Sequence, residues 1–270
     1  MLFVCPKCSQ KLNISGSIAV CERGHSYDRS KYGYYNLLLS SRGGTHGDNR
    51  EMCLARRDFL SLGYYEPLAS ELSSLVLRYT PPLSALLDAG CGEGYYTDKI
   101  ERALADRDGK TNVSAFDISK DAVRLAYKRN SSVSFAVAGS YSMPISDGSV
   151  DTLVNVFSPF AKEESARVLS KGGVFIFVYP NERHLFALKS AIYDTPYENS
   201  PENIELAGFK RQENINVAYT MALSSKEDIK SLFMMTPYAY RTGERERARL
   251  DALTSLKCEA DFLIDVYVKE

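Results

Sequence analysis

The sequence predicts an α/β protein with a mostly parallel, doubly wound sheet and a small separate domain at its N-terminus. From residue 83 onward, short apolar segments alternate with segments of helical periodicity. Three of the six cysteines lie within the first 21 residues, and a glycine-rich polar segment follows at residues 40–48. The 270 residues correspond to just under two domains of about 150 residues each.

The composition is that of a globular protein that stays outside membranes. Hydrophobic residues make up 44% and charged residues 25% of the chain, which excludes wholesale disorder. The longest apolar run, Val174 to Tyr179, is far shorter than the ~20 residues that a membrane helix needs. The first residues lack the basic and apolar regions of a signal peptide, so we expect a cytoplasmic protein with no membrane partner.

The charge is distributed unevenly along the chain. The total is −1, but residues 1–60 carry nine basic and five acidic residues, so that this segment is +4 and the remainder −5. The near-neutral total argues against a protein covered with basic charge for nucleic acid. The basic N-terminal segment still permits local contact with phosphate.

The early cysteines have the spacing of a metal site. Cys5, Cys8, Cys21 and His25 form the pattern C-x2-C-x12-C-x3-H, in which two close pairs can clamp one zinc ion from both sides. Four such ligands complete a tetrahedron and leave no open position, so the pattern predicts a structural zinc site. The alternative is three buried free cysteines, but a segment this small needs a metal to fold.

Aromatic and cationic residues follow the predicted zinc ligands. The tyrosines can stack on unpaired bases beside the cations, or they can pack the small domain against the rest of the chain. Both interpretations remain open at this point, as does the choice between a nucleic-acid reader and a protein-interaction module. The residues concerned are Tyr27, Tyr32, Tyr34 and Tyr35, with Arg29 and Lys31.

Two helices are expected between the small domain and the alternating part. A capping box of Asp48 and Glu51 predicts a helix over 49–62, which carries Arg56 and Arg57. A second helix begins near Pro67 and presents an apolar stripe that is typical of core packing.

The alternating part predicts strands at 84–88, 113–118, 133–138, 150–157 and 174–179, with helices between them. The intervening helices are expected at 95–107, 119–129, 161–169 and 183–193. Two more strands, 214–221 and 260–268, flank a helix capped at Ser225. Because ligands of such sheets bind at the carboxyl ends of the strands, the functional residues should lie there.

The first and second strands of this part end in a cofactor-binding pattern. Asp88 precedes a loop in which Gly90, Gly92 and Gly94 allow a ligand to approach the backbone, and Asp117 ends the next strand. An acid at that position accepts hydrogen bonds from the two ribose hydroxyls of a nucleoside. Asp88 and Glu93 disfavour a pyrophosphate but suit the cationic S-adenosylmethionine, which we therefore prefer to NAD.

The fourth strand ends at Phe157, Ser158 and Pro159, where a small-Pro turn beside an aromatic ring can hold a planar nitrogen base. A simple strand-ending turn is the alternative interpretation. The following 166–173 segment is expected to be a helix end with a glycine stop.

Together these motifs resemble one family, the bacterial 23S ribosomal RNA guanine-N1 methyltransferases. The resemblance spans nearly the whole chain, because it includes the zinc-ligand cluster and several runs outside the glycine loop. Those runs are 33–38, 55–57, 63–65, 88–97, 183–185 and 235–241.

The resemblance implies a zinc-ribbon domain for RNA recognition at 1–40, linker helices at 41–82 and a class I, Rossmann-like methyltransferase domain at 83–270. It implies S-adenosylmethionine contacts at Gly92, Glu93, Tyr65 and His184. It further implies 23S ribosomal RNA as the partner, with a domain II hairpin as the target, and homodimers. The family's two groups modify neighbouring guanines of that hairpin, and this chain has features of both.

Guanine N1 carries a proton, so methylation requires help with its removal and alignment of N1 with the methyl group. Phe157 to Pro159 is the expected base pocket, and Arg56 and Arg57 are expected to contact phosphate. The alternatives are a methyltransferase acting on another RNA or a small molecule, a non-catalytic zinc-dependent RNA-binding protein, and a nicotinamide-dependent oxidoreductase.

Overall fold

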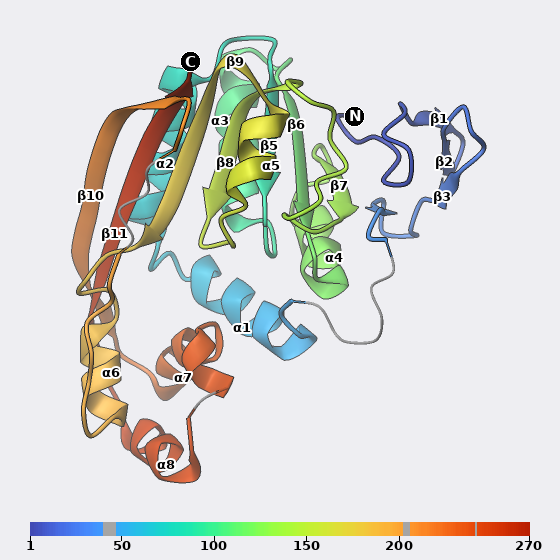
Figure 1. Cartoon of the computed structure of the whole chain (residues 1–270). Coiled ribbons are helices and arrows are strands. Elements are labelled where there is room, and N and C mark those ends of the chain that lie inside the picture. Colours follow the sequence, from blue (N-terminus) through green and yellow to red (C-terminus); the bar gives the residue numbers. More distant parts are fainter. Residues whose placement is uncertain (40–46, 202–205, 241) are drawn as a thin grey trace.

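The protein is described by a computed structural model that covers residues 1–39, 47–201, 206–240 and 242–270 (Figure 1). Its centre is an eight-stranded sheet in the order β10-β11-β9-β8-β5-β6-β7-β4. Six neighbouring strands, β9, β8, β5, β6, β7 and β4, are parallel to one another. Strand β11 runs antiparallel to both β9 and β10. The bounds are β4 Tyr35–Asn36, β5 Ala85–Ala89, β6 Asn112–Asp117, β7 Ser134–Val137, β8 Val150–Val156, β9 Leu169–Pro180, β10 Phe209–Leu223 and β11 Leu256–Lys269.

The prediction of a mostly parallel, doubly wound sheet is confirmed. The chain passes outward from β5 through β6 to β7, and then returns to the other side of β5 to form β8 and β9. The strand order therefore reverses between β5 and β8, and the crevice at this switch point is where ligands of open α/β sheets bind. The predicted glycine loop follows β5, so it lies at this crevice.

Helices cover both faces of the sheet (Figure 1). Their buried residues follow helical spacing, such as Leu68, Leu72 and Leu75 of α2, which accounts for the stripe seen in the sequence. The helices are α2 Glu66–Tyr79, α3 Tyr95–Arg107, α4 Lys120–Arg129 and α5 Lys162–Val168.

Other helices gather below the carboxyl ends of the parallel strands and form a helical cap (Figure 1). In this cap, α7 packs against α1, α8 and η1, and α6 packs against α8. The cap helices are α1 Arg50–Ser61, α6 Phe186–Ile192, α7 Lys226–Met234, η1 Pro237–Tyr240 and α8 Glu244–Ala252. The segments preceding and interrupting the sheet thus close the side where ligands are expected.

The N-terminal domain is a three-stranded antiparallel sheet of β1 (Asn13–Ser15), β2 (Ile18–Val20) and β3 (Ser26–Asp28). It is joined to the main body, because Phe3 is buried and forms a bridge with Ile145. The predicted 1–40 segment also contributes β4, which pairs in parallel with β7 at the edge of the main sheet.

Several predicted boundaries differ from the structure. The α1 cap is Asn49, whose side chain accepts from the Met52 amide, whereas Asp48 pairs with Arg56. The expected helix end at 166–173 is largely strand, since β9 begins at Leu169. Helix α8 was not predicted because its sequence is almost entirely polar, with only Leu250 buried. Most of the predicted 40–48 loop lies outside the described residues.

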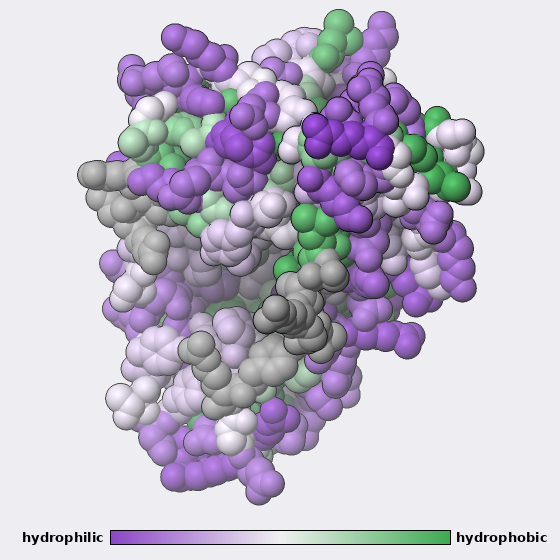
Figure 2. Space-filling view, turned by 45° about the vertical axis from the view of Figure 1, so that its right-hand side comes forward, coloured by the Kyte–Doolittle hydropathy of each residue, from purple (hydrophilic) through white to green (hydrophobic). Residues whose placement is uncertain are grey.

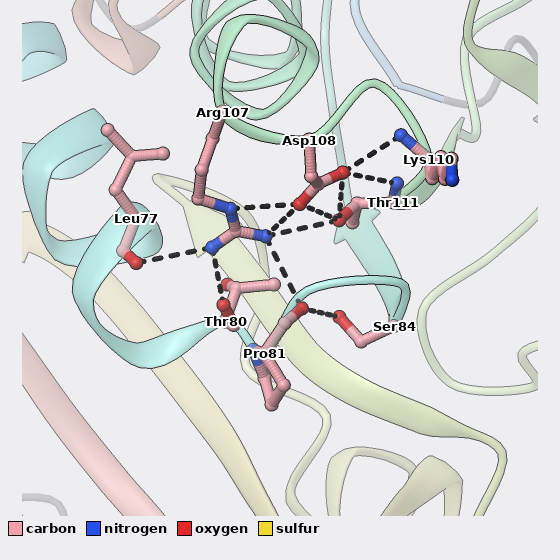
Figure 3. A network of polar contacts seen from close by, with 8 residues as sticks. All are labelled: Leu77, Thr80, Pro81, Ser84, Arg107, Asp108, Lys110 and Thr111. Atoms are coloured by element: carbon pink, nitrogen blue, oxygen red, sulfur yellow. Dashed lines mark hydrogen bonds and ion pairs between the residues drawn. The ribbon is translucent and has the colours of Figure 1, made fainter.

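A polar network fixes α2, α3 and the start of β6 to one another (Figure 3). The Arg107 guanidinium donates to the carbonyl oxygens of Leu77, Thr80 and Pro81, at 3.3, 2.6 and 3.3 Å, which caps the end of α2. It also contacts Asp108, whose carboxylate accepts from backbone amides in the loop before β6. These amides and Arg107 hold the pKa of Asp108 well below its ordinary range.

Across the parts of the chain that the structure describes, we find no helix with the length and apolar character required to span a membrane.

Candidate active site and metal centre

The glycine loop after β5 requires glycine for steric reasons. The Gly90 and Cys91 amides both donate to the Phe116 carbonyl at 2.9 Å, which holds the loop against the end of β6. Gly90 has a φ of +88°, and a Cβ there would lie 2.0 Å from the Ser158 Oγ. A Cβ on Gly92, in contrast, would meet nothing closer than the Arg56 guanidinium at 3.8 Å, so the backbone there stays open to a ligand.

Asp88 at the end of β5 is a buried carboxyl with an unused acceptor. Its Oδ2 accepts from the Thr97 hydroxyl at 2.5 Å, while its Oδ1 is buried without a partner among the described residues. Burial raises the pKa of Asp88 to about 7. Burial also raises the pKa of the neighbouring Cys91 thiol far above its ordinary value.

Two further acids surround the loop. The Glu93 Oε2 accepts from Arg129 at 2.6 Å, while its Oε1 is buried without a partner in the described structure. The Asp117 carboxylate accepts from the amides of Gly92 and Ser119, at 3.0 and 2.8 Å. Burial raises the pKa values of both Glu93 and Asp117. Acids are therefore concentrated at the loop, as the sequence predicted.

A cavity of about 1070 Å³ lies between this loop and the helical cap. Figure 2 shows the surface hollowed between the body of the molecule above and the lower lobe that the cap helices form. The cavity is lined by most of the predicted cofactor residues together with residues of the cap. The predicted residues in its wall are Tyr65, Asp88, Gly90, Gly92, Glu93, Asp117, His184, Phe157, Ser158, Pro159 and Arg56.

Gly94 is the one predicted loop residue that packs away from the cavity. It precedes α3 in the left-handed conformation, and a Cβ there would lie 2.8 Å from the Cβ of Ala126. Its role is therefore to let α3 approach α4 closely.

The two arginines of α1 lie in different surroundings. Arg56 pairs with Asp48 and donates to the Met235 carbonyl at 3.3 Å, so it joins α1 to the end of α7 from within the cavity wall. Arg57 is partly exposed and pairs with the adjacent Asp58 at 2.7 Å. Contact with phosphate remains a prediction for both residues. Sequence reasoning missed the position of Arg56 because it depends on α1 lying across the strand ends.

Tyr65 and His184 come together although 119 positions separate them in the chain. The His184 Nδ1 accepts from the Asp261 amide at 3.4 Å, and the Nε2 lies 3.5 Å from the Tyr65 hydroxyl. Burial lowers the pKa of His184 to about 3, so the ring is neutral at physiological pH. Both rings pack against Phe262, which fixes this part of the cavity wall.

The turn after β8 is held by a residue that sequence reasoning passed over. The Asn155 side chain accepts from the Ser158 amide at 3.2 Å and donates to the Pro159 carbonyl at 3.3 Å. Phe157 adopts a φ of +54°, which is uncommon for a bulky residue, and its side chain is 41% exposed. Such strained positions cluster at functional sites, which supports a role for this turn beyond ending the strand.

An aromatic pocket of about 440 Å³ adjoins the cavity beside this turn. Phe160, Phe177, Tyr179 and Tyr197 form much of its wall, and the last three also line the larger cavity. The Tyr179 hydroxyl donates to the fully buried Asp265 at 2.9 Å, which fixes this ring. The two cavities together provide adjacent spaces for a nucleoside cofactor and a second planar group.

The hydrogen-bond acceptors that line the cavity fit S-adenosylmethionine. The unpartnered oxygens of Asp88 and Glu93 are acceptors for a cationic ligand, and the Asp117 carboxylate has remaining acceptor capacity for ribose hydroxyls. A pyrophosphate would meet three carboxyl groups here, so NAD fits less well.

The predicted metal ligands converge in the N-terminal domain. The ligand atoms of Cys5, Cys8, Cys21 and His25 all lie within 4.8 Å of one another. The Cys8 and Cys21 sulfurs are 3.7 Å apart, and the His25 Nδ1 lies 3.4 and 3.5 Å from the Cys5 and Cys21 sulfurs. Tetrahedral zinc places sulfur and nitrogen ligands about 3.5–3.8 Å apart, so the cluster fits this ion.

Two family profiles match the chain. The profile described as "RlmA, N-terminal" matches residues 3–40, and the one described as "Methyltransferase domain" matches residues 86–173.

Curated relatives extend over most of the chain. A candidate 23S rRNA (guanine-N(1)-)-methyltransferase of Bacillus subtilis is 29% identical over 98% of this chain and 95% of its own length. One of Micromonospora griseorubida, also named as a candidate, is 32% identical over 68% of this chain and 67% of its own. The 23S rRNA (guanine(748)-N(1))-methyltransferase of Streptomyces fradiae is 33% identical over 70% of this chain and 66% of its own.

The chain belongs to the 23S rRNA (guanine-N1)-methyltransferase family. It is an S-adenosylmethionine-dependent methyltransferase with a structural zinc site, as the sequence predicted. The crystal structure of a candidate methyltransferase from Bacillus halodurans has a TM-score of 0.50 with this chain at 16% identity. It covers 74% of this chain and 99% of its own, which supports the class I methyltransferase fold.

Proposed function

We propose that this protein transfers a methyl group from S-adenosylmethionine to N1 of a guanine in a domain II hairpin of 23S ribosomal RNA. The observation that carries the proposal is one cavity, walled by acids on one side and aromatic rings on the other, in a chain that also has the zinc ribbon of this family. The named substrates of the relatives support the choice of RNA and of guanine N1.

The acids of the glycine loop bind and orient the cofactor in this proposal. Asp117 accepts from the ribose hydroxyls, while Asp88 and Glu93 lie beside the cationic part of the ligand. When bound, S-adenosylmethionine supplies an electrophilic methyl group with its own leaving group, so no covalent enzyme intermediate is required. Neutral His184 and Tyr65 shape the wall without adding a second positive charge.

The target guanine lies beside the Phe157–Pro159 turn and enters the adjoining aromatic pocket. Its N1 is on the pairing edge, so the base must leave its stack or lie in a loop before it can react. Stacking on the aromatic side chains of the pocket replaces part of the stacking that the base loses in the RNA, and Asn155 holds the turn in place. The helical cap would hold N1 in line with the methyl group, and the N1 proton would pass to solvent as the base is methylated.

Partner and location follow from this substrate. The protein acts in the cytoplasm on 23S ribosomal RNA, and we propose a homodimer because the resemblance implies one. Light scattering of the purified protein at micromolar concentration tests the dimer: a mass near 60 kDa, twice the 30.1 kDa chain, supports it, and a mass near 30 kDa contradicts it.

Primer extension tests the reaction and its position together. Large-subunit RNA from a strain that lacks the modification is incubated with the protein and S-adenosylmethionine, with Asp117→Ala as the background control. A methyl group at N1 blocks pairing and halts reverse transcriptase, so we expect one new stop in the domain II hairpin, at position 748 or at a neighbouring guanine. No stop on RNA or on ribosomal particles, with the cofactor still bound, would contradict the proposal.

A further inference from the structure

The structure separates the tyrosines that follow the zinc ligands into two groups. The Tyr27 hydroxyl lies 3.2 Å from the Cys5 sulfur, while Tyr34 and Tyr35 are buried in the core. These three rings therefore pack the ribbon, and they are not free to stack on bases. Tyr32 differs, because it is partly exposed at the junction between the ribbon and α4.

Three cations surround the Tyr32 ring. The Arg124 guanidinium lies 4.2 Å from the ring centroid, and the amines of Lys31 and Lys128 lie 5.2 and 5.9 Å from it. Lys31 belongs to the N-terminal segment, whereas Arg124 and Lys128 belong to α4 of the methyltransferase body. The basic group is thus built from both parts of the chain.

These cations have no acidic partner in the described regions. No carboxylate there lies within 4.0 Å of Lys31, Arg124 or Lys128. Arg124 and Lys128 are also four residues apart on one helix, where like charges destabilise. In contrast, the next cation of α4, Arg129, pairs with Glu93 at 2.6 Å. The contacts of the Tyr32 ring offset only part of the repulsion, so the group is suited to an external anion.

The junction is packed tightly enough to hold this arrangement. Gly33 has a φ of +84°, and a Cβ there would lie 2.1 Å from the Tyr127 ring of α4. The Arg29 side chain donates to the Gly33 carbonyl at 3.1 Å, and the Tyr32 amide donates to the Ser30 hydroxyl at 3.2 Å. The turn that carries Lys31 and Tyr32 is therefore fixed against α4.

Two of the three cations belong to a helix that also contributes to the cavity wall. Ala122, in the first turn of α4, lines the cavity, and Arg124 and Lys128 follow two and six residues later on the same helix. Along the axis of α4 these two residues lie about 3 and 9 Å from Ala122, and the turn of about 100° per residue places them on the opposite side of the helix from it.

We propose that Lys31, Arg124 and Lys128 bind the phosphate backbone of the substrate RNA. The inference rests on the proposed function and adds the surface that positions its substrate. Because Arg124 covers the Tyr32 ring, this surface binds phosphates and does not stack on bases. It explains why the ribbon is docked on α4, since only the docked arrangement brings cations of both parts together.

The test compares two triple variants of the full-length, zinc-loaded protein with equal changes in charge. One replaces Lys31, Arg124 and Lys128 by glutamine, and the other replaces Lys171, Lys210 and Lys257. The control lysines are exposed on β9, β10 and β11, on the far side of the sheet from α4. Binding of the 23S domain II hairpin RNA is measured by fluorescence anisotropy from 50 to 300 mM KCl, and methyl transfer is measured in parallel.

We expect the patch variant to bind RNA at least tenfold more weakly, and the slope of log affinity against log salt to flatten by roughly two units. Its KM for RNA should rise, while S-adenosylhomocysteine affinity, zinc content and the control variant's RNA binding stay unchanged. Equal RNA affinity and equal slopes for the two variants would overturn the inference. If the wild-type protein binds the hairpin through this patch without methylating it, the proposed function fails and the patch stands.

Discussion

Replacing Asp88 by asparagine should stabilise the protein at neutral and alkaline pH while it weakens cofactor binding. Asp88 is fully buried, and burial raises its pKa from the ordinary 3.8 to about 7. Between these two pH values the folded state binds one more proton than the unfolded state. Stability therefore falls by about 1.4 kcal/mol for each pH unit across this window, on the order of 4 kcal/mol in total.

Asparagine imitates the protonated carboxyl, because its oxygen can still accept from Thr97 and it carries no charge. Urea unfolding of wild-type protein and Asp88→Asn at pH 5 and pH 8 gives the comparison. We expect the variant to be more stable than the wild type by roughly 1.5–2 kcal/mol at pH 5 and by roughly 4 kcal/mol at pH 8. Asp251→Asn, at an exposed position of α8, should change neither value.

The same variant should bind S-adenosylmethionine more weakly, because in the proposed function the unpartnered oxygen of Asp88 accepts from the ligand. In this account, the buried charge of Asp88 lowers the stability of the protein at neutral pH but contributes to cofactor binding. A stability difference between variant and wild type that does not change with pH would refute the claim that the buried charge of Asp88 destabilises the protein. Stronger cofactor binding by the variant would refute the proposal that the Asp88 carboxyl binds the cofactor.

The remaining predictions concern the zinc site, the ribose-binding acid and the polar network. Cys21→Ala should release zinc, measured by a chromophoric chelator, and expose the ribbon to protease while S-adenosylhomocysteine still binds; retained zinc would contradict the site. Asp117→Ala should weaken S-adenosylhomocysteine binding by roughly 10- to 100-fold in calorimetry, since hydrogen bonds to a charged group are lost. Arg107→Met should lower the free energy of unfolding by about 1–3 kcal/mol, because it uncaps α2, whereas Arg102→Met, at an exposed pair on α3, should leave it almost unchanged.

The parts of the site that the sequence predicted are those with local signals. Gly90 has a backbone angle and a close neighbour that favour glycine, and Asp117 is marked by its place at a strand end. The zinc ligands are equally local, because their spacing alone brings two short pairs together. The parallel sheet followed from apolar strands that alternate with helices.

What the sequence did not predict depends on contacts between distant segments. The sequence pattern places Arg56 on the surface of a helix. It reaches the cavity only because α1 packs on α7, where its side chain donates to the Met235 carbonyl. Strand β4 has two residues and no periodicity, so its pairing with β7 could not be read from the pattern. The basic group around Tyr32 also exists only after the ribbon docks on α4.

The most direct test of the central claim is nucleoside analysis of the methylated RNA. Domain II hairpin RNA is treated with the protein and isotope-labelled S-adenosylmethionine, digested to nucleosides and separated by liquid chromatography with mass spectrometry. We predict label in 1-methylguanosine alone, approaching one methyl group per RNA. Label in a different methylated nucleoside, or none while the cofactor binds and zinc is retained, would contradict the account.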